Sequence, residues 1–390
     1  MAERALRILV IGNLPPHVLG GAENQVARLV TEWARAGVSV EVAGHRIPDG
    51  VQNLSGQAIR THRMRAWGFG GRIGRALGYA ASMAGLVLRK RHAYDVVYCR
   101  GIGDGVLCLV VLKAMKLCRW PIMACPINAR GAGDAAFVRS IPGWRWLAKL
   151  IDRHVQAINL INTAIADDLK AIGIERPRLS RVPNGIAIQD LQPRASVAKV
   201  RRLVWTGRHS EQKGLDLLLL ALASCRQQGI DFRLDLFGDG VQRDALMRQA
   251  EQLVLADCIR FRDPVAAEEV RLVLLDADIF VLPSRYEGMS NSALEAMESG
   301  LPVLCTRCGG IDGYIEGEAG WVCDPNSVDG LLEALLRMFA ASDEDVLRLG
   351  RRARALVEHQ FAIEAVAAAN LSLLAQVAGR EGAYAPACSQ

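Results

Sequence analysis

The stretch that decides the fold is DIFVLPSRYEGMSNSALEAMESGLPV, residues 278–303. Its apolar run 279–282 predicts a buried strand, which ends at Pro283 and is followed by a loop. Ser290 is a good N-cap residue, so we expect a helix to begin near it and to precede a second apolar run at 303–305. Strand, helix and strand in this order are the unit of a parallel sheet that helices cover.

The same alternation extends along nearly the whole chain. Two sets of short runs rich in Val, Ile and Leu, separated by longer segments of helical period, predict two doubly wound α/β domains. The strands expected in the first set are 6–11, 38–43, 58–62, 96–99, 122–125 and 157–161, and those in the second are 203–205, 233–237, 258–261, 279–282 and 303–305.

Turn residues between the two sets mark the expected domain boundaries. Residues 1–185 are predicted to form an N-terminal Rossmann-like domain, and residues 201–360 a C-terminal one. Residues 186–200 contain prolines and little apolar periodicity, so they are predicted to form a linker. A final helix at 361–379 is expected to pack back on the N-terminal domain, with a tail at 380–390.

The composition excludes several classes of protein. Of 390 residues, 51% are hydrophobic and 23% are charged, which is too apolar for a disordered chain. No convincing run reaches the roughly 20 residues of a membrane-spanning helix. Ten scattered cysteines are typical of a reducing compartment, so we expect a cytoplasmic protein. Cys305 and Cys308 lack the second pair that a zinc site needs. We therefore expect these two cysteines to be ordinary thiols that hold no zinc.

Candidate ligand contacts lie in the loops that follow strands, where open parallel sheets bind their ligands. Gly20 and Gly21 precede a predicted helix, so the backbone there can approach an anion closely. Arg208 and Lys213 follow the strand at 203–205, and a guanidinium with an ammonium suits a diphosphate. The competing interpretation of the two glycines is a flexible turn, and that of Arg208 and Lys213 is a pair of solvated surface cations.

Two carboxylates in the stretch 278–303 are further candidate ligand contacts. Glu287 lies in the loop after a strand and Glu295 about one turn into a helix, where both can accept hydrogen bonds from sugar hydroxyls.

The chain here resembles glycosyltransferase family 4, whose members have the GT-B fold of two facing Rossmann-like domains. The resemblance rests on Glu287 to Glu295, the Arg208 and Lys213 pair, LFGDG at 236–240, PNGI at 183–186 and the glycine pair before Glu23.

The resemblance implies a transferase that binds a UDP- or GDP-linked sugar in its C-terminal domain and a glycan or lipid-linked acceptor in its N-terminal domain. By this resemblance, Arg208 and Lys213 hold the diphosphate of the donor. Glu295 binds the ribose and Glu287 the transferred sugar. The backbone amides of Met289, Ser290 and Asn291 orient the donor. Gly20 and Gly21 are expected to face the diphosphate from the other domain.

The implied chemistry requires no metal and no cofactor and retains the anomeric configuration, with a phosphate oxygen of the leaving group taking the acceptor's proton. The expected acceptor is a cell-surface polysaccharide, a lipopolysaccharide or a glycolipid. Two alternatives remain open from the sequence. One is a nucleotide-sugar 2-epimerase, which uses a similar architecture, and the other is a non-catalytic nucleotide-sugar-binding partner of another transferase.

The sequence departs from the family in two loops. The histidine that often follows the fifth strand of the first domain is absent from ACPINARGAGDAAF at 124–137. In RFRDPV at 260–265, Arg262 stands where family members more usually have a small residue near the nucleotide base. The resulting weak candidates for sugar, acceptor or base contacts are His17, Asn128, Arg130, Asp134 and Arg262.

Charge is distributed unevenly along the chain. Residues 1–190 contain 26 Lys and Arg against 13 Asp and Glu, whereas residues 191–390 contain 21 against 28. Residues 60–91 combine basic and apolar side chains without one carboxylate, which suits peripheral contact with an anionic membrane. The competing interpretation is a core helix with solvated flanks. No nucleic-acid recognition motif is present, so no nucleic-acid partner is expected.

Overall fold

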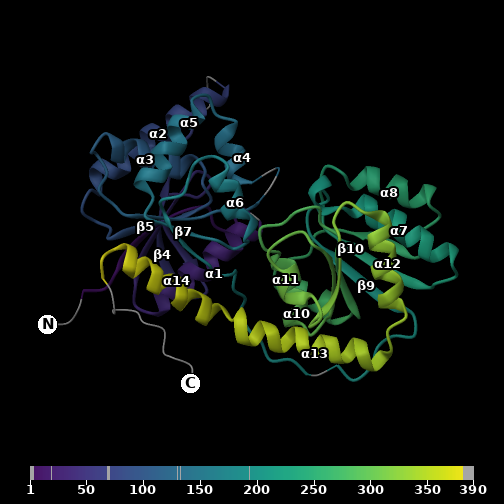
Figure 1. Cartoon of the computed structure of the whole chain (residues 1–390). Helices are drawn as coiled ribbons and strands as arrows, with labels where there is room; N and C mark the ends of the chain where they lie inside the picture. Colours follow the sequence, from purple (N-terminus) through teal and green to yellow (C-terminus); the bar gives the residue numbers. More distant parts are fainter. Residues whose placement is uncertain are drawn as a thin grey trace. The chain divides into compact units, whose positions relative to one another are not determined.

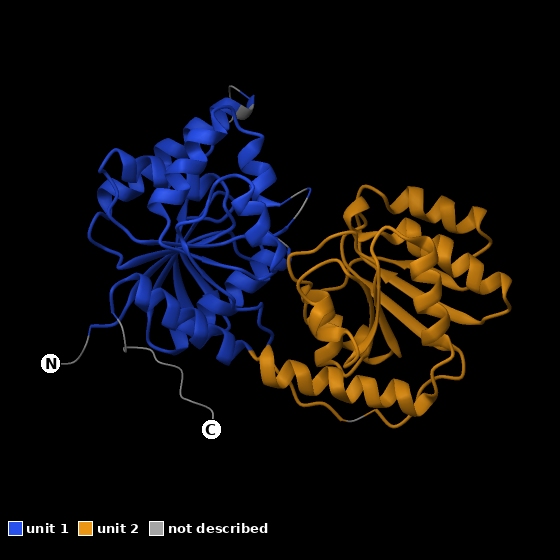
Figure 2. Ribbon diagram, viewed as in Figure 1, with its two compact units in different colours: residues 1–187, 363–390 blue, residues 188–362 orange. Residues whose placement is uncertain are grey.

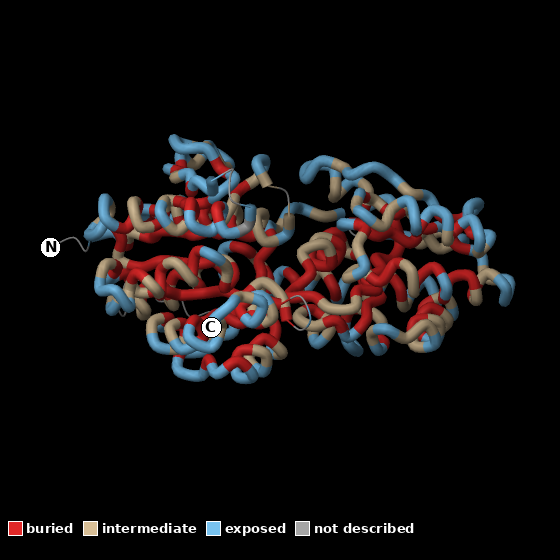
Figure 3. The backbone as a smooth tube through the Cα atoms, turned by 90° about the horizontal axis from the view of Figure 1, so that it is seen from above, coloured by how far each residue is buried: buried red, intermediate tan, exposed pale blue. Residues whose placement is uncertain are grey.

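The computed structural model describes residues 4–18, 20–67, 71–129, 131, 133–192 and 194–380 (Figure 1). The chain divides into two compact units, residues 1–187 with 363–390 and residues 188–362 (Figure 2). Each unit has a largely parallel sheet with helices on both faces, and buried residues concentrate in the two sheets (Figure 3). The prediction of two doubly wound α/β domains is confirmed.

Unit 1 contains an eight-stranded sheet in the order β3-β4-β2-β1-β5-β6-β7-β8, in which all pairs except β3 with β4 are parallel. Its strands are β1 Arg7–Ile11, β2 Ser39–Gly44, β3 Gly50–Leu54, β4 Gln57–Arg63, β5 Val96–Arg100, β6 Ile122–Cys125, β7 Ala157–Asn159 and β8 Arg178–Ser180. Its helices are α1 Gly21–Arg35, α2 Gly71–Arg89, α3 Asp104–Ala114, α4 Asp134–Arg139, α5 Trp144–His154, α6 Ala164–Lys170 and α14 Ile363–Val377.

The last helix, α14, belongs to unit 1 although it comes from the end of the described chain (Figure 2). It packs against α1, and the Trp33 indole donates a 2.9 Å hydrogen bond to the Ala367 carbonyl. Its first residue, Ile363, donates a backbone hydrogen bond to Ile186. A Cβ on Gly185 would lie 2.8 Å from the Ile363 side chain, so glycine permits this close approach.

Unit 2 contains a six-stranded parallel sheet in the order β11-β10-β9-β12-β13-β14. Its strands are β9 Arg201–Thr206, β10 Phe232–Phe237, β11 Ile259–Arg262, β12 Ile279–Leu282, β13 Val303–Thr306 and β14 Gly320–Cys323. Its helices are α7 Leu215–Gln227, α8 Arg243–Gln252, α9 Val270–Leu275, α10 Asn291–Glu298, α11 Asp312–Ile315, α12 Val328–Phe339 and α13 Asp343–Gln360, with a 3-10 turn, η2, at Glu211–Lys213.

Three short strands were not predicted from the sequence: β3, β8 and β14. The β3 strand pairs with β4 through a two-residue turn at Ser55 and Gly56, whose φ angles are 48° and 85°. Such a turn matches the twist of a hairpin, but β3 is mostly exposed and lacks apolar alternation. Of the predicted linker, residues 188–192 and 194–200 belong to unit 2, because buried carboxylates of that unit hold them.

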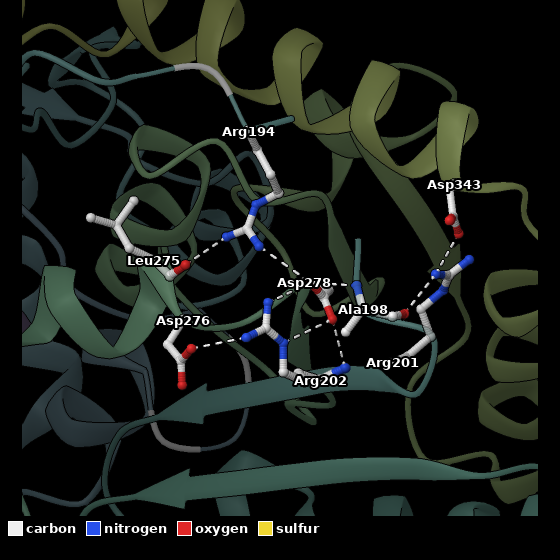
Figure 4. Close-up of polar contacts among 8 residues, drawn as sticks. All are labelled: Arg194, Ala198, Arg201, Arg202, Leu275, Asp276, Asp278 and Asp343. Carbon is white, nitrogen blue, oxygen red and sulfur yellow. Dashed lines mark hydrogen bonds and ion pairs between the residues drawn. The ribbon is translucent and has the colours of Figure 1, made fainter. Parts of the chain in front are cut away.

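Asp278, at the start of β12, is the centre of this attachment (Figure 4). Its side chain has 0% exposure and receives hydrogen bonds from the Arg202 backbone N–H at 2.9 Å and from the Arg202 guanidinium at 3.0 and 3.2 Å. Arg194 of the predicted linker donates to the same carboxylate at 3.2 Å. One buried carboxylate therefore joins the segment before β9 to the starts of β9 and β12.

We predict that Asp278→Ala lowers the free energy of unfolding by about 3 kcal/mol, because it leaves the two guanidinium groups without their buried partner. Asp276 is the matched control, since it also accepts from Arg202 at 2.9 Å but its side chain is 85% exposed. Asp276→Ala is expected to cost less than about 0.5 kcal/mol. Urea denaturation of both variants measures the difference, and equal losses would contradict the role given to Asp278.

Candidate functional site

The candidate site lies at the carboxyl ends of β9 and β12. In the strand order of unit 2, β10 and β11 lie on one side of β9, whereas β12, β13 and β14 follow on the other. The boundary between β9 and β12 is therefore a topological switch point, where open α/β sheets bind ligands. The loops that follow these two strands carry Arg208, Lys213 and Glu287.

Lys213 and Glu287 form the central contact of the site. The Lys213 ammonium lies 2.5 Å from Oε1 of Glu287, and the Ser284 hydroxyl donates to the same oxygen at 2.8 Å. Glu287 is 5% exposed, and its backbone N–H donates to the Cys308 carbonyl at 2.7 Å. The carboxylate predicted to bind the sugar and an ammonium predicted to bind the diphosphate are therefore side by side.

Arg285 provides a second connection between the same loops, which sequence reasoning missed. Its guanidinium binds both carboxylate oxygens of Asp216, at 2.8 and 2.7 Å, and donates to the Glu211 carbonyl at 2.6 Å. The Arg285 backbone N–H donates to the Gln212 carbonyl at 2.8 Å. The hydrogen bonds from Arg285 hold the pKa of Asp216 below its usual value.

Two glycines allow the loops to approach this closely. Gly214 has φ +63°, and a Cβ on it would lie 2.1 Å from the Pro283 carbonyl oxygen. Gly310 has φ +77°, and its Cβ would lie equally close to the Gly288 carbonyl oxygen. Both positions exclude any residue with a side chain unless the loops move apart.

The α10 helix begins at the floor of the site, as predicted. Ser290 is its N-cap residue, and its hydroxyl accepts the Ala293 backbone N–H at 3.3 Å. Met289 is buried, and Asn291 and Glu295 are half-buried. The helix thus presents an N-terminal turn and one acidic side chain beside the loop that carries Glu287.

Arg208 differs from Lys213 in its surroundings. Its side chain is exposed and has no hydrogen-bond or ion-pair partner among the described residues. The next residue, His209, is fully buried between the rings of Trp205 and Phe261, and burial lowers the pKa of its imidazole. The loop is therefore anchored by a neutral histidine while its arginine stays available for a ligand.

The predicted candidates of unit 1 fall into different environments. Gly20 is the N-cap residue of α1, with an extended φ of 179°, and Gly21 is the first residue of that helix. His17 is exposed and Asn128 half-buried, whereas Arg130 lies outside the described residues.

Asp134 was expected to contact sugar or acceptor, but its carboxylate has structural partners. It accepts backbone N–H groups from Ile102, from Ile127 at 2.8 Å and from Asn128 at 3.3 Å, which joins the loops after β5 and β6. Burial raises the pKa of this carboxyl.

Arg262 was expected near a base, but it too has an internal partner. Its Nε donates to Asp235 of the neighbouring strand at 2.9 Å. The guanidinium is therefore held along the sheet by β10, and its side chain remains partly exposed.

A cavity that sequence reasoning missed lies in unit 1 where β1 and β5 are neighbours and the strand order again reverses. It has a volume of about 190 Å³ and is lined by residues that include Asn13, His45, Arg100 and Asp104. The His45 side chain is exposed, and partial loss of its hydration, reinforced by the charge of Arg46, lowers the pKa of its imidazole. The cavity offers donors and acceptors of the kind that bind hydroxyl groups.

The described ranges contain no cluster of three or more His, Cys, Asp or Glu side chains that could hold a metal ion. They also contain no helix of sufficient length and apolarity to span a bilayer.

We predict that Asp216→Asn speeds amide hydrogen exchange in residues 211–215 and 284–287 by roughly fivefold. The change removes the charge that Arg285 binds bidentately, and such a partly exposed pair contributes about 1 kcal/mol to keeping the loops closed. Asp231→Asn, at the exposed pair with Arg226, is the matched control and should leave these loops unchanged. Unchanged exchange in Asp216→Asn would show that Arg285 does not close the site.

The chain is similar to two families of glycosyltransferase domains along most of its length. Residues 20–185 match the family described as glycosyl transferase 4-like domain, and residues 200–341 match glycosyl transferases group 1. The putative colanic acid biosynthesis glycosyltransferase WcaL of Escherichia coli is 29% identical over 205 residues, which is 50% of each chain. Glycogen synthase of Mycobacterium tuberculosis is 27% identical over 389 residues, 90% of this chain and 89% of its own.

The fold has relatives among solved structures. The HepE protein of Anabaena, solved with UDP-glucose, superposes with a TM-score of 0.73 at 19% identity over 95% of this chain and 100% of its own. Together, the two matched families cover most of both units, and the two sheets have the GT-B architecture. The chain therefore belongs to the family-4-like glycosyltransferases with the GT-B fold.

Proposed function

We propose that the protein transfers a sugar from a UDP- or GDP-linked donor to a glycan or lipid-linked acceptor of a cell-surface polysaccharide, lipopolysaccharide or glycolipid. The observation that carries the proposal is the contact of Lys213 with Glu287 at the switch point of unit 2. Arg208, on the same loop as Lys213, has no partner among the described residues. A diphosphate and a sugar ring are joined by one bond, so their partners must also be neighbours. The names of WcaL, a polysaccharide enzyme, and of the UDP-glucose complex of HepE support the acceptor and donor classes.

The donor contacts follow from this arrangement. Arg208 and Lys213 bind the diphosphate, and Glu287 accepts hydrogen bonds from hydroxyls of the transferred sugar. Glu295 binds the ribose from within α10. Backbone N–H groups at 289–291, at the start of that helix, orient the donor.

The reaction breaks the bond between the anomeric carbon and a diphosphate oxygen and forms a bond from an acceptor hydroxyl oxygen to the same carbon. Attack on the same face, through an oxocarbenium-like transition state, retains the configuration. The acceptor proton passes to an oxygen of the departing diphosphate. Arg208, Lys213 and the start of α10 stabilise the negative charge on that group, in the place of a divalent metal.

The acceptor is assigned to the cavity in unit 1. Asn13, His45 and Asp104 at its wall can donate to and accept from hydroxyl groups. His45, which follows β2, supplies an imidazole in a unit whose expected histidine after β6 is absent.

Transfer is favoured over the two alternatives by the comparisons, whose named relatives are glycosyltransferases across both units. A 2-epimerase would consume donor without an acceptor and release an epimer. A non-catalytic partner would bind donor without any turnover. Donor turnover with and without acceptor separates all three.

We place the protein on the inner face of a membrane that holds its acceptor. The nine described cysteines are all free thiols, which suits a reducing cytoplasm. Within the basic segment 60–91, α2 buries Tyr79, Met83, Leu86 and Val87 but exposes Ile73 and Leu77 at 74% and 54%. The helix is thus partly core and partly surface, and Phe69 of the same segment lies outside the described residues.

We predict that Arg208→Gln weakens binding of the donor nucleotide at least about tenfold, since a hydrogen bond to a charged group contributes about 1.5–3 kcal/mol. Because Arg208 is exposed and unpaired among the described residues, its loss should not change the melting temperature. Lys213→Ala is a less clean variant, because it leaves the buried Glu287 without its cation. Calorimetric titration with UDP- and GDP-sugars measures the effect, and unchanged affinity for both would refute the assignment.

We also predict that the product keeps the anomeric configuration of the donor sugar and that excess EDTA leaves the transfer rate unchanged. Proton NMR coupling constants of the new linkage report the configuration. An inverted product, or activity restored only by added divalent ions, would contradict the proposed chemistry.

A further inference from the structure

The outer surface of α4 and α5 in unit 1 combines exposed aromatic rings with exposed cations. The α5 helix buries Leu147, Ala148 and Ile151 on its inner face. On its outer face, Arg145, Lys149 and Arg153 follow one another at the helical spacing of four residues. Phe137 and Arg139 are exposed on α4, which packs against α5. We name the α5 surface by its members Phe137, Arg139, Arg145, Trp146, Lys149 and Arg153, all of them exposed.

The aromatic side chains of the α5 surface are unusually accessible. Trp146 is 56% exposed and Phe137 40% exposed. A large ring gains by leaving water, and an indole combines an apolar body with one polar group. Both properties favour the boundary between water and lipid.

The cations of the α5 surface have no acidic partners within the described part of the chain. The four Lys and Arg side chains form no ion pair, although Arg145 lies 5.0 Å from the centre of the Trp144 ring. The nearest carboxylate in the sequence, Asp152, instead pairs with Arg176. In unit 2, by contrast, Arg226, Arg243 and Arg307 all bind neighbouring carboxylates.

The sequence explains this absence. From residue 71 to residue 154, which covers α2 to α5, the chain has fourteen Lys and Arg but only four Asp and no Glu. Three of the four aspartates are occupied inside the unit, Asp134 by backbone N–H groups, Asp95 by Arg7 and Asp152 by Arg176. The four cations of the α5 surface are therefore left for an external partner.

We propose that the α5 surface is the face with which this protein docks on an anionic lipid bilayer. The proposal rests on the proposed attachment to a membrane, and it moves the principal contact from the segment 60–91 to α5. Arg139, Arg145, Lys149 and Arg153 lie over the anionic headgroups, while Trp146 and Phe137 enter the interface. Because they start exposed and unpaired, the cations need not break an internal ion pair to bind.

The charge and the exposed rings of the α5 surface favour an anionic bilayer over a second copy of the chain or a nucleic acid. In a symmetric dimer, four unpaired cations would face the same four cations of a second copy, which is repulsive. A nucleic acid would match the charge but would contact phosphates chiefly through the cations. Of a second copy, a nucleic-acid duplex and a bilayer, the bilayer is the one that uses the exposed rings and the cations together.

Co-sedimentation with vesicles tests the proposal. One set of vesicles is phosphatidylcholine alone, and the other contains added phosphatidylglycerol. The wild type should bind the second set, and less at high salt. R145Q/K149Q/R153Q should bind about a hundredfold more weakly, at about fivefold for each charge removed. F137S/W146S should also lose binding, whereas W146F should keep it.

Two further variants complete the design. M247S/R248Q on α8 of unit 2 changes an exposed apolar residue and an exposed cation in the same way, and it should bind like the wild type. I73S/L77S measures the share of α2. Unchanged circular dichroism and nucleotide affinity verify that each variant is folded.

Three results would overturn the proposal. The first is wild-type binding by the α5 variants together with loss in I73S/L77S, which would leave membrane attachment standing but place it on α2. The second is vesicle binding that F137S/W146S leaves intact and that duplex DNA displaces at equal phosphate concentration. The third is no vesicle binding by the wild type, which would also refute membrane attachment but not the donor site, since Arg208→Gln tests that separately.

Discussion

The contact between Lys213 and Glu287 is the interaction on which the site depends. It joins the loops that follow β9 and β12, the two strands that meet where the order of the sheet reverses. Arg285 and Asp216 close the same two loops from the side, and Gly214 removes the Cβ that would hold them apart. The loops are therefore arranged before a ligand arrives, which reduces the cost of ordering them on binding.

The short strand β12 connects this site to the stability of unit 2. At its start, the buried Asp278 binds Arg202 and Arg194 and fixes the segment that enters the unit. At its end, Pro283 leads into the loop with Glu287 and then into α10. The carboxylate that stabilises the unit, Asp278, lies at one end of the strand, and the carboxylate of the candidate site, Glu287, follows the other end. Stability and ligand binding therefore depend on different side chains.

Local features of the fold could be predicted from the sequence. The strand at 279–282, the Ser290 cap and the helix that follows depend on neighbours within a few residues, and all three are as expected. The pairing of Lys213 with Glu287 spans 74 residues and depends on which strands are neighbours in the sheet. The alternation of strands and helices does not determine that order, so the contact became visible only in the structure.

Sequence reasoning missed the surroundings of Arg285, Asp134 and His45 for one reason, which is that they depend on residues distant in the sequence. Arg285 was visible as a cation between Ser284 and Tyr286, but its partner Asp216 lies on the other loop. Asp134 carried the right chemistry for a sugar contact, yet its three backbone partners come from loops that only the sheet brings together. His45 gave no signal, because a lone histidine after a strand is uninformative until the cavity around it is known.

The central claim is that the diphosphate of a nucleotide-sugar binds at the end of β9, between Arg208 and Lys213 and beside the start of α10. A crystal structure of the protein soaked with its preferred UDP- or GDP-sugar tests this directly. The account predicts phosphate oxygens within hydrogen-bonding distance of both cations and the sugar hydroxyls at Glu287. A nucleotide bound elsewhere, with the Lys213–Glu287 contact undisturbed and Arg208 still unpaired, would contradict it.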